Sequence, residues 1–152
     1  PSYNNVGFAA ISGSDVIFDR RDRHTIENVI SAKYNFNKRT GITFRARHYW
    51  SDKETKEYYL LNPDGHISHH PNFTKNTNQN FNAFNIDAVY TWQFAPGSFV
   101  NVVYKNAIYA FDDVVNSDYF KNIDKTFSAP QNNNLSLKVI YYLDYLKLRK
   151  KG

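Results

Sequence analysis

Residues 84–94 run Phe84-Asn85-Ile86-Asp87-Ala88-Val89-Tyr90-Thr91-Trp92-Gln93-Phe94 and alternate apolar with polar side chains, interrupted once at Val89. Because a strand sends successive side chains to opposite faces, one face of this segment is apolar and aromatic and the other is polar. Such a strand is typical of a sheet with lipid on one side and water on the other. The stretch therefore predicts a membrane-facing β-strand.

The same alternation recurs along the chain. It predicts five long strands, over residues 24–36, 42–51, 81–94, 98–109 and 133–145. Single residues interrupt it, namely Asn28, His48, Tyr49, Val103, Ile140 and Tyr142. Soluble strands usually span about five or six residues, so these lengths favour a membrane sheet over a soluble antiparallel sandwich, the alternative that the pattern leaves open.

The connections between the expected strands alternate in length. Residues 37–41 and 95–97 have the composition of tight turns, whereas residues 52–80 and 110–132 are long, polar segments. Outer-membrane barrels have short periplasmic turns and long extracellular loops. We therefore expect an all-β fold, an antiparallel transmembrane β-barrel of which residues 1–152 form the carboxy-terminal part, with the carboxyl end on the periplasmic side of the bacterial outer membrane.

Aromatic residues fall near both ends of these strands, as they do in the interfacial girdles of membrane barrels. The expected girdle consists of Tyr34, Phe36, Phe44, Trp92, Phe94 and Tyr145 near the tight turns, and Trp50 and Phe84 near the long loops. In a soluble protein the same aromatics would form a core or bind an apolar or carbohydrate ligand. Outer-membrane lipid is the partner that the membrane interpretation implies.

Charged residues occupy the opposite, lumen-facing side of the expected strands. They are Glu27, Lys33, Arg45, Arg47, Asp87, Lys105, Lys138 and Asp144. Their basic excess would suit a pore that favours anions, but pairing of charges across neighbouring strands is the simpler interpretation. The run Asp19-Arg20-Arg21-Asp22-Arg23 predicts a salt-bridged loop at the outer rim.

Composition excludes several kinds of chemistry. The chain of 152 residues has no cysteine, which excludes disulfides, thiolate zinc sites and a cysteine nucleophile. Aromatic residues make up 17% of it, yet its mean hydropathy is -0.63 and no apolar run of about 18 residues exists, which argues against a transmembrane helix. The chain opens on Pro1 without a signal-peptide pattern, so we expect a processed or excised piece.

The formal net charge is +5, part of which lies in Lys147, Arg149, Lys150 and Lys151. A nucleic-acid interface would combine such charge with aromatic stacking platforms. Most basic residues here alternate singly with apolar ones instead of forming a stripe, so no nucleic-acid partner is expected. The basic tail predicts a solvated end close to anionic head groups.

Three segments resemble the carboxy-terminal barrel domain of a family of Bacteroidetes outer-membrane proteins. They are Ile17-Phe18-Asp19-Arg20-Arg21-Asp22-Arg23-His24-Thr25-Ile26-Glu27-Asn28, residues 81–106, and residues 135–145. The central one, around Tyr90-Thr91-Trp92-Gln93-Phe94-Ala95-Pro96-Gly97-Ser98, is the most specific. The chain departs from the family pattern at Asp19, where glycine is expected, and at Tyr104, where tryptophan is expected.

The resemblance implies a barrel domain of unknown function that usually follows a periplasmic domain similar to a family 9 carbohydrate-binding module. It implies no known activity. For a membrane barrel linked to such a domain, we expect the role of an anchor or of a transport component. Because the smallest single-chain membrane barrels have about eight strands, five strands require upstream strands or another barrel chain to close. Other outer-membrane proteins are further expected partners.

Side chains capable of catalysis or metal binding are concentrated in the two long loops. His66, His69 and His70 lie near Asp64, but Asn62-Pro63-Asp64-Gly65 is a turn sequence that explains Asp64 by itself. Ser68 beside His69 resembles a hydrolase pair only in sequence. The carboxylates of the other loop, Asp112, Asp113, Asp118 and Asp124, are typical of solvated loop charges. We therefore predict no catalytic residue, no metal site and no cofactor. A barrel enzyme with its active site in the outer loops, dependent on His66 or His69, is the third alternative, after the membrane barrel and the soluble ligand-binding protein.

Overall fold

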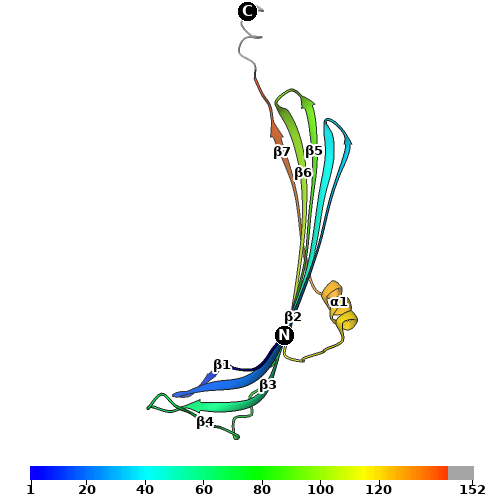
Figure 1. Ribbon diagram of the computed structural model, residues 1–152. Helices are drawn as coiled ribbons and strands as arrows, with labels where there is room; N and C mark the ends of the chain where they lie inside the picture. The colour runs from blue at the N-terminus through cyan, green and yellow to red at the C-terminus, as the bar shows by residue number, and fades with distance from the viewer. Residues whose placement is uncertain (144–152) are drawn as a thin grey trace, which may run out of the picture. The chain divides into compact units, whose positions relative to one another are not determined.

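The computed structural model describes residues 1–143, and antiparallel strands dominate them (Figure 1). Over this range the order of elements is β1 (Ser2–Ser12), β2 (Asp15–Asn37), β3 (Thr40–Leu61), β4 (Ile67–His69), β5 (Gln79–Ala95), β6 (Ser98–Asp112), α1 (Tyr119–Ser128) and β7 (Gln131–Ile140). The described strands form one seven-stranded sheet in the order β1-β2-β3-β5-β6-β7, with β4 paired to β3. This path does not return on itself, so the described sheet is open.

The all-β antiparallel class is confirmed, and the predicted strands correspond to β2, β3, β5, β6 and β7. The boundaries differ most at the ends predicted as loops. Strand β2 begins at Asp15, so the predicted rim loop around residues 19–23 is part of a strand, and β3 continues to Leu61, well into the predicted loop 52–80. Strand β7 ends at Ile140, five residues before the predicted end, of which Asp144 and Tyr145 lie outside the described residues.

Two hairpin turns of the structure lie where the sequence predicts tight turns, within residues 37–41 and 95–97. Strands β2 and β3 are separated by Lys38 and Arg39, and β5 and β6 by Pro96 and Gly97. Gly97 has a φ of 72°, a left-handed conformation that glycine adopts without steric cost. A third tight turn, through Gly13 and Ser14, joins β1 to β2 and lies at the end of the strands where the predicted long loops are found.

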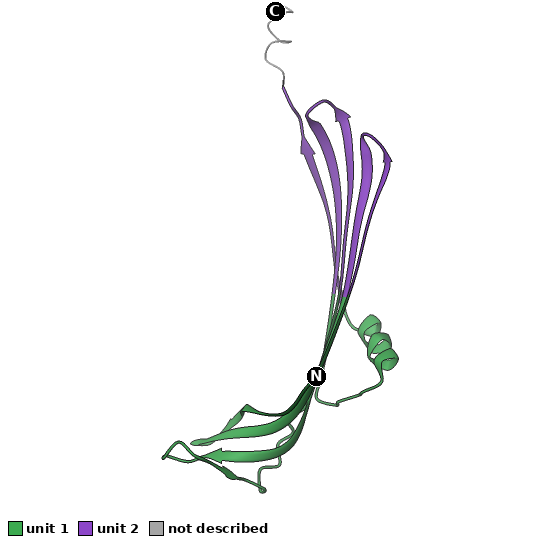
Figure 2. Cartoon of the chain, in the orientation of Figure 1, with its two compact units in different colours: residues 1–28, 48–84, 108–130 green, residues 29–47, 85–107, 131–152 purple. Residues whose placement is uncertain are grey.

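The described chain divides into two compact units, which Figure 2 shows in different colours. Unit 1 comprises Pro1–Asn28, His48–Phe84 and Ile108–Pro130, and unit 2 comprises Val29–Arg47, Asn85–Ala107 and the residues from Gln131 onward. Strands β2, β3, β5 and β6 contribute residues to both units. Each unit has its own pattern of burial.

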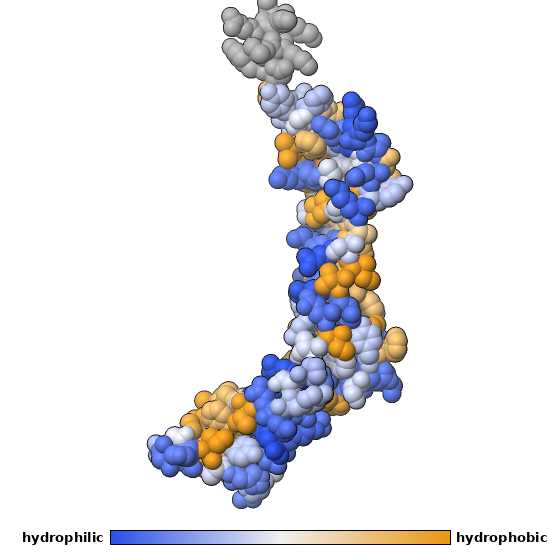
Figure 3. All heavy atoms as spheres, viewed as in Figure 1, coloured by the Kyte–Doolittle hydropathy of each residue, from blue (hydrophilic) through white to orange (hydrophobic). Residues whose placement is uncertain are grey.

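The described part of unit 2 consists of strand segments and tight turns, followed by residues 141–143. Among its described residues the buried side chains are Ser98 and Asn106, and no apolar side chain is buried. Apolar residues instead lie at the surface, as the space-filling view of the molecule illustrates (Figure 3). Leu135 is 73% exposed and Ile30 67% exposed. A single layer of strands leaves both of its faces open in this unit.

Unit 1 has buried residues because other segments cover its strands. Its buried apolar residues are Ala10, Ile17, Trp50, Ala83 and Ile108. Helix α1 packs against one face, where Phe127 contacts Phe84 and Tyr119 contacts Trp50. Residues 75–78, which lead into β5, bond to β3 side chains and backbone, as in the bond from Thr55 N–H to Asn78 Oδ1.

Helix α1 lies inside the segment predicted as a long polar loop. Asp118 caps its amino end by accepting hydrogen bonds from the backbone N–H groups of Phe120 and Lys121, and Pro130 follows its last turn. Within residues 1–143, no helix is long and apolar enough to span a membrane.

Candidate functional site

The polar face of the unit 2 sheet gathers several of the residues predicted to face a lumen. Lys33, Arg45 and Asp87 border one shallow depression of about 380 Å³, together with Ser31, Ala32, Thr43, Phe44 and Val89. Lys105 Nζ lies 3.9 Å from Asp87 Oδ1. Tyr104, on the other face, donates a hydrogen bond to Asn133. Lys138 lies five residues after Asn133 on β7, an odd number of steps, so strand alternation places Lys138 on the same face as Lys105.

The charges on this face of unit 2 do not balance. The basic side chains are Lys33, Arg45, Arg47, Lys105 and Lys138, and Asp87 is the acidic one among the described residues of the unit. Arg47 and Glu27 each have an interaction partner, and Glu27 belongs to unit 1. Asp144, predicted to share this face, lies outside the described residues. Pairing between strands therefore neutralises only part of the basic charge.

The opposite face of unit 2 carries aromatic side chains in contact with one another. The rings of Tyr34 and Phe36 lie 5.0 Å apart, those of Trp92 and Phe94 5.8 Å apart, and Phe94 stacks on Tyr141 at 6.2 Å. Phe44 is also exposed. Strand alternation assigns Phe44 to the same face as these two aromatic pairs, although its residue also borders the depression on the polar face. Tyr145 lies outside the described residues.

The other two predicted girdle residues have different surroundings. Trp50 is 5% exposed, and its Nε1 donates a hydrogen bond of 2.9 Å to Asn80 Oδ1 beneath α1. The exposed rim position predicted for Trp50 is therefore wrong, because a helix that the sequence did not reveal covers it. Phe84 is half-buried, with its ring 4.9 Å from that of Phe127.

Unit 1 contains a buried ionic cluster centred on Asp19. The Asp19 side chain is 0% exposed, and its Oδ2 accepts hydrogen bonds from Lys53 Nζ at 3.1 Å, Thr55 Oγ1 at 2.9 Å and Thr77 Oγ1 at 3.2 Å. Arg21 Nε lies 2.9 Å from the other carboxylate oxygen. Lys53 is itself 4% exposed. Asp19 Oδ1 is buried and has the Arg21 ion pair but no hydrogen-bond donor among the described residues, whereas Oδ2 accepts three hydrogen bonds. Two cationic partners and two hydroxyl donors compensate most of the cost of burying this carboxylate, which makes a structural role the direct interpretation.

More exposed ion pairs surround this cluster. Arg20 Nη2 lies 2.6 Å from Glu57 Oε1, and Tyr59 donates a hydrogen bond of 2.7 Å to Glu57 Oε2. The Tyr59 hydrogen bond is the main reason that the pKa of Glu57 is lowered, and it raises the pKa of Tyr59 in turn. The salt bridging predicted for residues 19–23 is confirmed, although it occurs within strand β2 and not in a loop.

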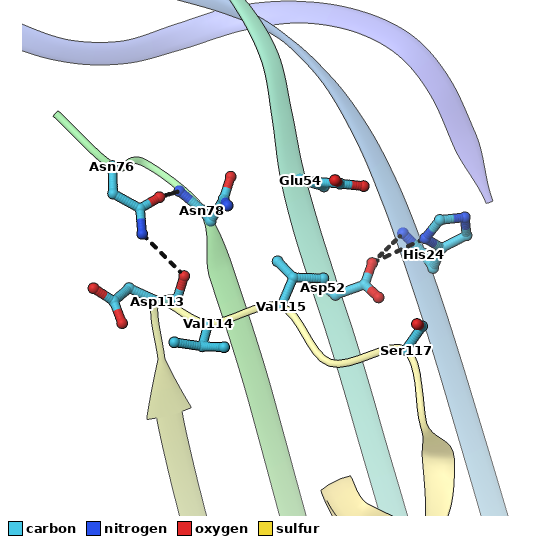
Figure 4. Close-up of a pocket in the computed structure, with 9 residues that line it drawn as sticks. All are labelled: His24, Asp52, Glu54, Asn76, Asn78, Asp113, Val114, Val115 and Ser117. Carbon is cyan, nitrogen blue, oxygen red and sulfur yellow. Dashed lines mark hydrogen bonds and ion pairs between the residues drawn. The ribbon is translucent and has the colours of Figure 1, made fainter. Parts of the chain in front are cut away.

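A polar pocket of about 410 Å³ lies beside the segment that leads into α1 (Figure 4). It is lined by His24, Asp52, Glu54, Asn76, Asn78, Asp113, Val114, Val115 and Ser117. Asp52 is buried and accepts hydrogen bonds of 3.0 Å from the backbone N–H of His24 and from its ring Nδ1. Asn76 Nδ2 donates to the Asp113 carbonyl at 3.2 Å. The pocket offers carboxylate and amide groups that could hydrogen-bond a small polar molecule.

The loop histidines do not converge on a common point. His66 Nδ1 lies 3.5 Å from Asp64, the His69 ring lies 5.9 Å from Tyr59, and the His70 ring lies 6.4 Å from Phe73. Over the range 1–143, no group of three or more His, Cys, Asp or Glu side chains is arranged to hold a metal ion. The geometry of these side chains gives no support to a hydrolase built on Ser68, which donates its hydroxyl hydrogen to Asn62 Oδ1 at 3.3 Å.

The model of one protein family, described as a domain of unknown function (DUF5916), matches residues 1–152. The chain belongs to this family. No curated protein and no solved structure matches it. Membership of the DUF5916 family gives the chain a classification without an activity, and the resemblance to Bacteroidetes barrel domains stays a prediction.

In this DUF5916 chain, the residues that sequence reasoning missed lie under α1. Asn80, Asn82 and Asn122 are buried and share hydrogen bonds: Asn122 Oδ1 accepts from Asn80 at 2.8 Å and from Asn82 at 3.3 Å. His48 is also buried there, with Nδ1 3.3 Å from Tyr119 Oη, and burial lowers its pKa. The apolar pattern is interrupted at Asn28 and His48, and both residues form hydrogen bonds to Tyr119 of α1. These interruptions were therefore a usable sign that another segment covers the strands there.

Proposed function

We propose that this chain is the carboxy-terminal part of an outer-membrane β-barrel, with unit 2 crossing the membrane. Its aromatic face contacts lipid and its charged face lines the barrel interior. The single observation that carries this proposal is the sheet of unit 2, whose described residues bury no apolar side chain and leave an apolar face exposed. Large contiguous apolar surfaces are rare on soluble monomers and mark contact with a partner or a membrane.

The two faces of unit 2 differ in the way that a membrane barrel requires. On β5, the residues Ile86, Ala88, Tyr90 and Trp92 alternate with Asn85, Asp87, Thr91 and Gln93. Water on the second face and lipid on the first would satisfy both sets of side chains without another layer of protein. A soluble β-protein that binds an apolar or carbohydrate ligand would instead need a second layer over the aromatic face.

The sheet edges supply the second part of the proposal. An open sheet in lipid would leave the backbone N–H and C=O groups of its edge strands unpaired, at a cost of several kcal/mol for each group. Strand β7 is one such edge. Upstream strands of the same protein or another barrel chain would pair with the edges and close the barrel, for which about eight strands are the minimum. The expected role of the closed barrel is to anchor or serve a periplasmic glycan-binding domain. The carboxyl end of the chain would lie in the periplasm.

Extraction from membranes tests the proposal. The protein in its natural sequence context should remain with the outer-membrane fraction in carbonate or high salt, and should stay monodisperse in detergent but not in plain buffer. An integral barrel behaves in this way because its aromatic face must be covered by lipid or detergent. Release by salt alone, or a monodisperse protein in plain buffer, would overturn the membrane proposal and favour the soluble ligand-binding protein.

Conductance distinguishes a pore from an anchor. The basic excess on the polar face predicts that an open lumen would prefer anions, and that the preference would fall in Arg45→Glu. Arg45→Gln removes one unit of positive charge where Arg45→Glu changes the charge by two, so it should lower the preference by a smaller amount. A barrel that inserts into bilayers without measurable conductance would exclude the pore and leave the anchor.

A further inference from the structure

The polar pocket lined by Asp52, Ser117 and their neighbours contains a buried carboxylate that the protein hydrogen-bonds on one side only (Figure 4). Asp52 is 2% exposed, and its Oδ1 accepts the hydrogen bonds from the backbone N–H and the ring Nδ1 of His24. No described residue donates to its Oδ2, which Figure 4 shows turned toward Ser117. A buried carboxylate is costly unless both of its oxygens have donors. Oδ2 is therefore available to a donor that enters the pocket.

Asp19 and Asp52 are both buried carboxylates of unit 1, but they differ in their cationic neighbours. Asp19 has ion pairs with Lys53 and Arg21, at 3.1 Å and 2.9 Å. Among the residues that the structure describes, Asp52 pairs with neither a lysine nor an arginine, and its basic neighbour His24 is charged only when protonated. A cationic ligand would supply for Asp52 the charge compensation that lysine and arginine supply for Asp19.

The rest of the pocket lining is acidic or neutral apart from His24. Glu54 and Asp113 add two carboxylates, and no lysine or arginine lines the pocket. Lys56 compensates Glu54, with its Nζ 2.7 Å from Glu54 Oε2, whereas the Asp113 carboxylate has no ion pair within residues 1–143. A cavity lined by one sign of charge attracts ligands of the opposite sign. The pocket therefore favours a cation over an anion or a neutral molecule.

We propose that this pocket binds a small organic cation, an aliphatic ammonium group that donates a hydrogen bond to Asp52 Oδ2. An ammonium group has three N–H donors, so a second one would serve the Ser117 hydroxyl, while Val114 and Val115 would contact the carbon chain. The cavity of about 410 Å³ is in the range of small-molecule sites. A metal ion fits less well, because within residues 1–143 no three His, Cys, Asp or Glu side chains are arranged to hold one. All lining residues belong to unit 1, so the proposal is independent of the membrane location of unit 2.

Titration with two matched probes tests the proposal. Protonated butylamine carries the charge and the N–H donors, and butanol has the same carbon chain without the charge. Ligand-observed NMR would follow the binding of both probes to the purified protein in its natural sequence context. Butylamine should bind saturably and butanol should not.

Variants of the lining residues locate the bound amine. Asp52→Asn should weaken butylamine binding about tenfold or more, the expected effect of losing a hydrogen bond to a charged group. Asp124→Asn, the matched control, removes an exposed carboxylate of unit 1 outside the pocket and should leave the binding unchanged. Asp113→Asn, a second variant, changes an exposed lining residue whose carboxylate has no hydrogen bond to the described residues, so it should fold normally and weaken the binding by a smaller factor.

Each other outcome counts against the ammonium site. Butanol that binds as tightly as butylamine would show that the pocket does not select a cation. Unchanged butylamine binding in Asp52→Asn would place the amine elsewhere, and if that variant does not fold, unchanged binding in Asp113→Asn decides the question in the same way. Displacement of butylamine by an equal concentration of Ca²⁺ would identify a metal site instead. Absence of saturable butylamine binding would overturn the proposal outright.

Discussion

Units 1 and 2 share four strands, yet they differ in which side chains they bury. In unit 1 the strands are covered by α1 and by residues 75–78, and the buried side chains include Asp19, Lys53 and Trp50. In the described part of unit 2 the strands have no covering layer and no buried apolar side chain. Unit 1 is stabilised by its own polar contacts, whereas the proposed membrane location would supply the surroundings that the apolar face of unit 2 lacks.

The difference explains why polar residues dominate the interior of unit 1. Its fully buried side chains include Asp19, Asn80, Asn82, Asn122 and Thr126. Buried polar groups stabilise a structure only when their partners are in place, and removing one partner costs more than the bond contributes. Substitutions that remove one partner in unit 1 should therefore have large effects, whereas unit 2 should respond mainly to polarity on one face.

The largest effect is expected in unit 1 for Asp19→Asn. Loss of the carboxylate leaves the buried Lys53 ammonium without its anionic partner, for which the expected loss of stability is about 3–5 kcal/mol. Denaturant unfolding of the reconstituted protein would measure it. Adding Lys53→Met should recover much of the loss, because the uncompensated charge is then gone. Equal losses in the single and double variants would show that the buried charge does not determine the effect.

Unit 2 should be most sensitive on its aromatic face. Ala88→Arg places a charge on the face assigned to lipid, and the expected loss of unfolding free energy is about 2–4 kcal/mol near the middle of the bilayer. Val89→Arg, the next residue of β5, places the same side chain on the polar face and should cost less than about 1 kcal/mol. Equal effects of the two substitutions in lipid would remove the distinction between the faces.

Strands were predictable from the sequence where alternation is regular. The five strands of unit 2 have this regularity, and the prediction of β5 and β6 was correct to within about three residues. Strand β1 was missed because its pairing with β2 shifts register twice, between Ser2 and Asn5 and between Phe8 and Ala10. A bulge moves the following side chains to the other face, so the period of two is lost.

The site was less predictable than the strands, because its contacts join distant residues. Asp19 is buried by Lys53, Thr55 and Thr77, which lie 34 to 58 residues further along the chain. A run of charges such as residues 19–23 looks like a solvated loop until those partners are known. Helix α1 was missed because it buries Asn122 and Thr126 and so lacks the apolar periodicity of a soluble helix, although the Asp118 cap and Pro130 marked its ends.

A smaller effect is expected where α1 meets the sheet of unit 1. Asn122→Ala removes one acceptor of the Asn80 and Asn82 amides, which keep their bonds to the Val114 carbonyl and to Asn80 Oδ1. Loss of a hydrogen bond to a buried amide costs about 1–3 kcal/mol. The mobility of a nitroxide at Lys121→Cys would report release of the helix. Asp124→Ala, exposed on the same helix, should leave that mobility unchanged. Release in both variants would point to general loss of helix stability instead of loss of the asparagine contacts.

The smallest effect should be the pH dependence of the same contact. Burial lowers the pKa of His48 below its ordinary value of 6.5, so the released state binds a proton more readily than the docked state. Docking of α1 through Tyr119 should therefore be complete above about pH 6.5 and weaken as pH falls below it, by at most about 1.4 kcal/mol per pH unit for one proton. His48→Gln should flatten this dependence in the nitroxide mobility, while His24→Gln, a control more exposed to solvent, should keep it. Persistence of the full pH dependence in His48→Gln would assign the proton to another group.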